Sequence, residues 1–388
     1  MRDGPAFSCD PSLYTGGGLY ETDAFEQPAS QDTLATRVAP LYGAYGYERP
    51  IHPERLIGSP DFVARLLAHA AWINGMYRQG AASALVRLGT SRLRDRRIDG
   101  RHGDRWRPLY EAERFVDRPY LQSPDGTGPI ERLPEGPTYL HLESAGSFNY
   151  GHFLVDDLAR FRALGLAGGG PVCVLMTSHG EVIDAVREAA LRTVCGGQAF
   201  AVRPLDPNVT YEVDALLFPS PVTLHPALKS PEALDDLADA AARSCRTTRI
   251  HGRPRGRGWR RIHVARRIER GRALANADEV ARFLSARRFV LVDPEALSFA
   301  EQVAVFSDAE IVVGAMGAAM TNTLFCRPGT RVLYLAPEGW LEPFYWDLAA
   351  ARGHAYAACY GQAGEGEPHF SPFAVTPRDL ERALDALR

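Results

Sequence analysis

The stretch that decides the fold is residues 310–336, which read EIVVGAMGAAMTNTLFCRPGTRVLYLA. An apolar run rich in β-branched residues ends at Gly314, and a turn of small residues leads into a predicted helix over 318–326. Pro328 and Gly329 end that helix before a second apolar run. This order of strand, turn, helix and strand is typical of a parallel α/β sheet.

The turn over residues 314–319 is a candidate phosphate-binding site. Ligands of parallel sheets lie beyond the carboxyl ends of the strands, where a glycine turn lets an anion approach a helix N-terminus. Gly314 and Gly317 fit neither the dinucleotide-binding fingerprint nor the lysine-containing phosphate loop. Taken alone, the motif is explained equally well by glycine needed for a tight packing turn.

Composition places the chain among soluble globular proteins. Its 388 residues are 45% hydrophobic and 23% charged, enough for two domains with separate cores. A net charge of -3 argues against a nucleic-acid partner. The six cysteines are scattered without a C-x-x-C pair, which is typical of reduced thiols in the cytoplasm. Since no signal peptide or membrane-spanning run is recognisable, we expect a cytoplasmic protein.

The pattern of apolar periods predicts four parts of the chain. Residues 1–110 read as an irregular and helical N-terminal extension, with one helix over 61–80. Residues 111–250 and 259–375 each read as an α/β domain, separated by the polar linker HGRPRGRG, and residues 376–388 as a terminal helix. Two α/β domains facing a cleft is the simplest architecture. Predicted helices include 151–164, 181–194, 231–244, 298–307 and 345–351, and predicted strands include 139–142, 171–176, 215–218, 262–265, 289–292, 331–335 and 356–360.

Residues 149–160, NYGHFLVDDLAR, contain a candidate acid–base pair. His152 and Asp156 are four residues apart, so on a helix they share a face and can form a hydrogen bond. An imidazole oriented by a carboxylate can act as a general base. For an isolated pair of this kind, a structural histidine with its counterion is the commoner explanation.

Further polar residues stand where a ligand of the second domain would bind. Arg266 and Arg267 follow a predicted strand, where a guanidinium could bind a phosphate, although solvated charge explains them equally well. Glu301 fits a capping box with Ser298 better than a contact to a ribose. Asn322 lies inside the predicted helix and faces either the cleft or solvent. No spacing typical of zinc or of a serine hydrolase occurs, so we predict neither metal nor cofactor.

In combination, these segments resemble glycosyltransferase family 61, the group of capsular-polysaccharide-type transferases and of O-linked GlcNAc and xylan transferases. The resemblance rests on an ordered series over about half the chain: N-x-x-H-x-x-x-D at residues 149–156, Arg266 after its strand, VDPEALSFAEQVAVFSDAEIVVG at 292–314, and G-A-x-x-T-N-x-L-F at 317–325.

The resemblance implies a GT-B-like fold of two Rossmann-like domains and a nucleotide-sugar donor held mainly by the C-terminal domain. It implies a glycan or other hydroxyl acceptor on the N-terminal side and usually inversion at the anomeric carbon. His152 and Asp156 would be the catalytic pair. Donor-side residues would be Arg266, Arg267, Glu301, Gly314, Met316, Gly317, Ala318 and Asn322, and acceptor-side residues would be Asn149, Asp157 and Arg160.

Three positions depart from the family pattern. Met316 stands where the family typically has histidine in G-x-H-G-A, Ala265 replaces the serine before Arg266, and Ala159 replaces a proline. Loss of the histidine removes a donor that could stabilise the charge of the leaving diphosphate.

The sequence therefore predicts a metal-independent, inverting hexosyl- or pentosyltransferase of surface or extracellular polysaccharide biosynthesis. It would be cytoplasmic or attached peripherally to a membrane that holds the acceptor, with no cofactor beyond its nucleotide-sugar co-substrate. The alternatives are a non-catalytic glycan- or nucleotide-binding relative, with Met316 marking a degenerate site, and, ranked lower, a Rossmann-type oxidoreductase.

Overall fold

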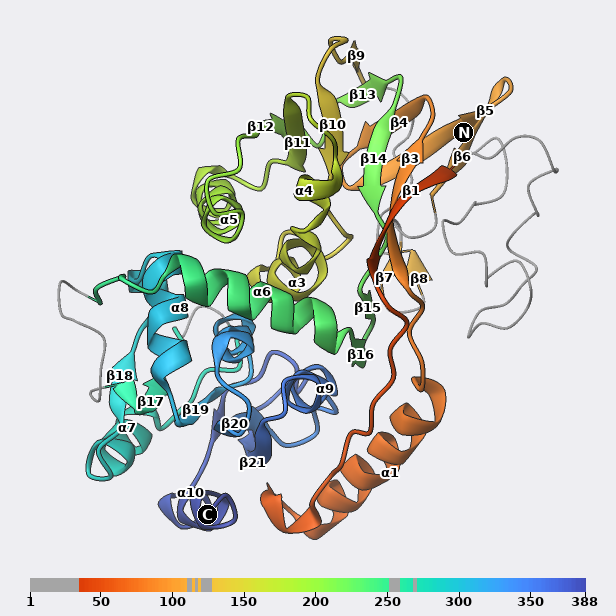
Figure 1. Ribbon diagram of the computed structural model, residues 1–388. Helices are drawn as coiled ribbons and strands as arrows, with labels where there is room; N and C mark the ends of the chain where they lie inside the picture. The colour runs from red at the N-terminus through yellow and green to blue at the C-terminus, as the bar shows by residue number, and fades with distance from the viewer. Residues whose placement is uncertain (1–34, 110–113, 116–117, 120–127, 251–258, 268–270) are drawn as a thin grey trace. The chain divides into compact units, whose positions relative to one another are not determined.

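The computed structural model describes residues 35–109, 114–115, 118–119, 128–250, 259–267 and 271–388 (Figure 1). The chain divides into two compact units. The first comprises the described residues up to Tyr45 together with Gln79–His225, and the second comprises Gly46–Arg78 and Pro226–Arg388. Residues 46–78 thus belong to the same unit as the C-terminal half of the chain. The predicted linker at 251–258 lies outside the described residues.

The first unit is built on a six-stranded sheet in the order β1-β3-β14-β10-β11-β12. Strands β10 to β12 and β14 run parallel, and β1 and β3 extend the sheet in antiparallel fashion. The bounds are β1 Ala35–Tyr42, β3 Ser83–Leu88, β10 Thr138–His141, β11 Val172–Thr177, β12 Ala201–Leu205 and β14 Leu216–Pro219.

A second, five-stranded sheet of the same unit has the order β6-β5-β4-β13-β9, and two short strands, β7 and β8, form a separate hairpin. The bounds are β4 Ser91–Arg94, β5 Arg97–His102, β6 Arg105–Pro108, β7 Arg114–Phe115, β8 Arg118–Pro119, β9 Ile130–Arg132 and β13 Thr210–Val213. The short strand β15 Thr223–Leu224 belongs to neither of these sheets. Buried apolar residues of both sheets, among them Leu93, Ile98, Leu175 and Leu216, form one core.

The helix predicted over 151–164 is broken in the structure. It consists of α3 Tyr150–His152, a π-helical turn η4 Phe153–Asp157, a 3₁₀ turn η5 Leu158–Arg160 and α4 Ala163–Leu166. Nε of Arg160 donates to the backbone carbonyl of Asp156 at 2.6 Å, the acceptor that the N–H of residue 160 would use in an α-helix. A side chain therefore displaces the regular helical bond, while α5 Glu181–Val194 forms as predicted.

The second unit is a sheet in the order β18-β17-β19-β20-β21-β2, with β22 paired antiparallel to β21. All other pairs are parallel, as the opening stretch predicts. The bounds are β2 Leu56–Ile57, β17 Arg261–Val264, β18 Val290–Val292, β19 Ile311–Ala315, β20 Arg331–Pro337, β21 Ala355–Ala363 and β22 Phe373–Ala374. The short strand β16 Leu228–Lys229 lies outside this sheet.

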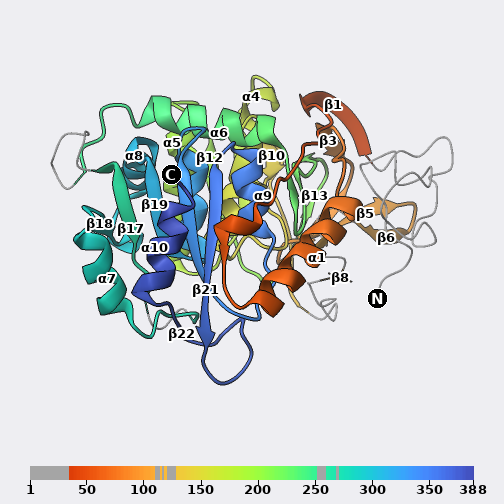
Figure 2. The ribbon, with the colours of Figure 1, turned by 90° about the horizontal axis from the view of Figure 1, so that it is seen from below.

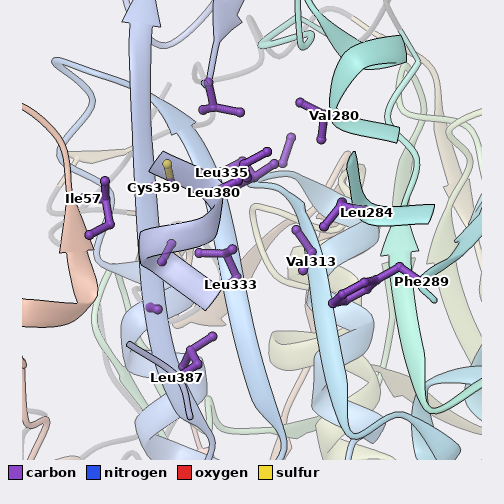
Figure 3. Close-up of a cluster of buried hydrophobic side chains, with 14 of the residues drawn as sticks. Ile57, Val280, Leu284, Phe289, Val313, Leu333, Leu335, Cys359, Leu380 and Leu387 are labelled. Carbon is purple, nitrogen blue, oxygen red and sulfur yellow. The ribbon is translucent and has the colours of Figure 1, made fainter. Parts of the chain in front are cut away.

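Helices cover both faces of this sheet (Figure 2). Helices α7 and α10 pack on one face, where Val280, Leu284 and Leu380 meet Val313 and Leu333 of the strands (Figure 3). On the other face, the hydroxyl oxygen of Tyr334 in β20 lies 3.2 Å from Oγ1 of Thr323 in the helix η9. The helical bounds are η3 Pro53–Arg55, α1 Pro60–Met76, α6 Pro231–Ser244, α7 Ala277–Ser285, η8 Pro294–Ala296, α8 Phe299–Asp308, η9 Ala318–Phe325, α9 Phe344–Ala351 and α10 Pro377–Asp385.

The helix after the glycine turn, η9, is a 3₁₀ helix rather than the regular helix expected over 318–326. Nδ2 of Asn322 donates to the carbonyl of Ala319 at 3.1 Å, and Oγ1 of Thr323 donates to that of Met320 at 2.8 Å. These bonds to carbonyls three residues back favour the tighter winding. The predicted capping box of Ser298 and Glu301 at the start of α8 is confirmed.

The chain is thus a mixed α/β protein with several sheets. Across the described ranges, no helix is both long enough and apolar enough to cross a membrane.

Candidate active site

His152 and Asp156 form the predicted pair in the first unit. Nδ1 of His152 lies 3.1 Å from Oδ2 of Asp156. Asn149 positions the segment, because its Oδ1 accepts the backbone N–H of Gly151 at 2.9 Å and so caps α3. The predicted one-turn spacing therefore brings the imidazole to the carboxylate, although the turn between them is π-helical.

His225 is a third member of this cluster that the sequence analysis missed. Its Nε2 lies 2.7 Å from the same oxygen, Oδ2 of Asp156, and its ring centroid lies 4.9 Å from that of His152. Oγ1 of Thr223 donates to the other oxygen, Oδ1, at 2.5 Å. Residues 149–156 follow β10 and residues 223–225 follow β14, which pairs parallel with β10. Adjacency of two parallel strand ends is the signal that could have found His225.

The surroundings keep Asp156 ionised. Burial by itself would raise the pKa of Asp156, but the charge of His225 and the hydrogen bond from His152 outweigh it and hold that pKa well below its usual range. An ionised carboxylate only accepts hydrogen bonds, so each imidazole donates an N–H to it. In neutral His152 the lone pair then lies on Nε2, the nitrogen that can accept a proton.

Asp157 and Arg160, predicted on the acceptor side, are enclosed by protein. Their side chains are 2% and 1% exposed, and Nη2 of Arg160 lies 3.2 Å from Oδ1 of Asp157. Nη1 of Arg160 donates to the carbonyl of Pro219 at 2.6 Å, and Ser147 donates to Oδ2 of Asp157 at 2.6 Å. Arg160 also donates to the carbonyl of Leu142. Both residues thus tie together the segments that hold Asp156.

In the second unit, Arg266 lies against the glycine turn. Its Nε donates to the carbonyl of Gly271 at 2.7 Å. Its Nη1 lies only 1.7 Å from where a Cβ on Gly317 would stand, so the guanidinium fills the space that this glycine leaves. Gly317 directly precedes η9, whose first N–H groups have no acceptor within the helix and favour an anion. The predicted proximity of Arg266 and the turn is present in the structure.

Arg272 is a second guanidinium at the same turn that the sequence analysis did not single out. Its Nε lies 3.3 Å from the carbonyl oxygen of Met316, and its Nη1 donates to the carbonyl of His369 at 2.8 Å. The guanidinium carbon lies 4.3 Å from the centre of the Trp340 ring, a cation–π contact. Two fixed positive charges therefore flank residues 316–317.

The other predicted donor-side residues have roles that their contacts define. Arg267 is half exposed and pairs with Asp293 and Glu295 at 3.0 and 3.2 Å. Glu301 is engaged in the capping box. The side chain of Asn322 is buried, and its Nδ2 lies 2.8 Å from Oε1 of Gln302. Arg267 therefore forms ion pairs at the surface, Glu301 caps α8, and Asn322 is buried within the second unit.

The residues of the glycine turn, 314–318, also differ in what their surroundings require. A Cβ on Gly314 would lie 2.5 Å from Sδ of Met320 and 3.0 Å from Cβ of Val264, so this glycine is required for packing between strand and helix. The side chain of Met316 is buried, and Ala318 is half exposed at the start of η9. Gly317 is thus the turn glycine that lies against Arg266, whereas Gly314 packs against Met320 and Val264.

The chemistry of the two sites is complementary. The first unit holds an imidazole with a fixed carboxylate, which can accept a proton from a hydroxyl group. The second unit holds two guanidiniums and a helix N-terminus, which can bind a phosphate group.

Comparison with known proteins agrees with this chemistry. No curated protein matches the chain. The family model described as Glycosyltransferase 61 matches residues 150–333, a stretch that contains His152, Asp156, His225, Arg266 and Gly317. The match supports glycosyltransferase activity, with a nucleotide sugar and an acceptor as substrates. The match over these residues supports the resemblance to glycosyltransferase family 61 that the sequence shows.

Proposed function

We propose that the protein transfers a hexosyl or pentosyl group from a nucleoside-diphosphate sugar to a hydroxyl group of a glycan or similar acceptor. The observation that supports this proposal most is the position of Arg266 against the backbone of Gly317 at the carboxyl end of β19. A diphosphate there would receive charge-assisted hydrogen bonds from the guanidinium and N–H groups from the start of η9.

In the proposed reaction, Nε2 of His152 removes the proton of the acceptor hydroxyl. The acceptor oxygen forms a bond to the anomeric carbon while the bond from that carbon to the diphosphate oxygen breaks, so the configuration inverts. Asp156 stabilises the imidazolium that results, and Arg266 and Arg272 stabilise the negative charge of the departing nucleoside diphosphate.

The proposed division of labour is that of a GT-B-like enzyme, with donor binding in the second unit and acceptor activation in the first. Because two guanidiniums supply positive charge beside the turn, we propose transfer without a metal ion. We further propose that the enzyme works in the cytoplasm, where nucleotide sugars are donors, and builds a surface or extracellular polysaccharide.

A donor screen tests the proposal. Purified protein is titrated by calorimetry with UDP-, GDP- and CMP-sugars, and each binding donor is then assayed for transfer to glycan acceptors. Arg266→Ala is expected to weaken donor binding at least tenfold. Arg261→Ala is the matched control, because Arg261 begins the same strand, β17, at its opposite end. Equal affinity of Arg266→Ala and Arg261→Ala would refute the donor site.

A second function is favoured by Met316, which replaces the family histidine and has a buried side chain. A glycan- or nucleotide-binding relative without catalysis would bind a donor in the same titration and show no turnover. Transfer separates the two: an enzyme transfers the sugar and loses that transfer in His152→Ala, whereas the wild type of a binding protein already shows none.

A further inference from the structure

We propose that His152, Asp156 and His225 form a binding site for one divalent transition-metal ion, with Zn²⁺ as the best fit, and that the bound ion prevents His152 from accepting a proton. The binding site stands on geometry alone. The inhibitory effect rests on the proposed function.

The three side chains supply a suitable set of ligands. Two imidazole nitrogens and one carboxylate oxygen, all within 4.8 Å of one another, are the donors that zinc and its neighbours in the first transition series accept. Around a tetrahedral zinc ion, with bonds of about 2.0–2.2 Å, ligand atoms stand roughly 3.3 Å apart. Oδ2 of Asp156 lies 3.1 Å from Nδ1 of His152 and 2.7 Å from Nε2 of His225, so small rotations of the rings would admit the ion.

The carboxylate at the centre of the cluster is fixed from outside. Thr223 donates to the oxygen that faces away from both rings, at 2.5 Å, and Arg160 donates to the backbone carbonyl of Asp156 at 2.6 Å. Such bonds from outer groups orient metal ligands and raise the affinity of a site.

The cluster is only partly enclosed. The side chain of Asp156 is 4% exposed, that of His225 11% and that of His152 20%, so His152 is the most exposed of the three ligands. Three protein ligands leave a fourth position of a tetrahedral ion for water.

Binding of the ion changes the tautomer of His152. A neutral imidazole has one N–H, which lies on Nδ1 while that nitrogen donates to Asp156. An ion coordinated to Nδ1 requires the proton to lie on Nε2, which then donates and has no lone pair. The ion needs the lone pair of Nδ1 and the acceptor hydroxyl needs the lone pair of Nε2. Because a neutral imidazole has only one such lone pair, binding of the ion excludes proton transfer to His152.

Metal titration of the full chain tests the site directly. Protein treated with a chelator is titrated with Zn²⁺ by calorimetry and with Co²⁺ by visible absorption, which reports tetrahedral coordination. We expect one equivalent in the wild type. The affinity should fall at least 100-fold in His225→Ala, and about tenfold or more in Thr223→Val, which removes only the outer hydrogen bond.

The matched control is His102→Ala, which removes an imidazole of the same unit from β5. Circular dichroism verifies folding, and His225→Gln, which retains a polar side chain, replaces His225→Ala if that variant unfolds. Unchanged Zn²⁺ affinity in the folded His225 and Thr223 variants, or an equal loss in His102→Ala, overturns the site.

Transfer assays separate this inference from the proposed function. Zn²⁺ at saturation should abolish transfer, and a chelator should restore it. One equivalent of Zn²⁺ bound by a protein that turns over no donor even in its metal-free state supports the site and counts against the enzyme. Full transfer at saturating Zn²⁺ overturns the inhibitory effect.

Discussion

Nη1 of Arg266 lies 1.7 Å from the position that a Cβ on Gly317 would occupy. Gly317→Ala should therefore displace the guanidinium of Arg266, which is the end of a flexible side chain. The substitution adds no backbone strain, because the backbone at Gly317 is extended and accepts any residue. We expect donor affinity to fall about tenfold, the equivalent of about 1.4 kcal/mol, while thermal stability changes little. Calorimetry and thermal unfolding of the same preparation measure both.

The contrasting change is Gly314→Ala three residues earlier. There the added Cβ meets Met320 and Val264 in the packed interface between β19 and η9, so overpacking should lower the free energy of unfolding by about 1–3 kcal/mol. Urea unfolding measures the loss. If Gly314→Ala and Gly317→Ala have the same effects on binding and stability, the distinction between a ligand glycine and a packing glycine is wrong.

The sequence predicted many elements of the later part of the chain because apolar periods and caps are local, whereas it missed the strands β1 and β3 to β6, which lie where an irregular and helical extension was expected. The opening stretch forms β19, η9 and β20 in parallel order, and α5, α6 and the capping box of α8 lie where their apolar periods and caps predict. What it could not predict is which side chains would replace backbone hydrogen bonds. Arg160 breaks a predicted helix through a bond to its own segment, and Asn322 and Thr323 tighten another.

In the candidate sites, too, the sequence predicts contacts between residues near in sequence better than contacts between distant ones. The spacing of His152 and Asp156 is local and was predicted, whereas His225 reaches Asp156 across 69 positions of sequence. The resemblance places Asp157 and Arg160 on the acceptor side, and the structure adds that their side chains are buried and lie 3.2 Å apart. Sequence alone does not show which charged residues are enclosed.

Arg160→Met should destabilise the first unit. It leaves the buried carboxylate of Asp157 without its cationic partner and releases the carbonyls of Pro219 and Leu142, which should cost about 3–5 kcal/mol. Arg192→Met is the control, because Arg192 forms an exposed pair with Glu188 that should contribute less than about 1 kcal/mol. Urea unfolding of the two variants should therefore differ clearly, and equal midpoints would contradict a structural role for Arg160.

Stability of the second unit should fall in acid. Burial lowers the pKa of His354 to about 3 and that of His263 to about 4, so both rings are neutral in the folded protein. In the unfolded chain they take up protons as the pH falls below about 6.5, and the folded state does not follow until about 3 to 4. Their contribution is therefore complete above about pH 6.5 and is lost as the pH falls through that window. Urea midpoints between pH 7.5 and 5 measure the effect, and His354→Gln should flatten the dependence. A midpoint that rises towards pH 5 would exclude this linkage.

Asp347 anchors residues 46–78 to the rest of the second unit. This fully buried carboxylate lies 2.8 Å from Nζ of Lys229 and 3.2 Å from Nη1 of Arg49, and the hydroxyl of Tyr47 donates to it at 2.7 Å. Asp347→Ala leaves two cations buried without their carboxylate and should cost about 3–5 kcal/mol.

Because Arg49 and Tyr47 belong to the N-terminal segment, the loss should appear first as detachment of that segment. Limited proteolysis should then cleave the variant within residues 46–78 at protease concentrations that leave the wild type intact. Asp379→Ala is the control, since it removes a partly exposed carboxylate from the start of α10 in the same unit. Asp347→Ala with wild-type resistance to the protease would show that apolar contacts, such as those of Phe62 and Ile73 in α1, hold the segment without the ionic cluster.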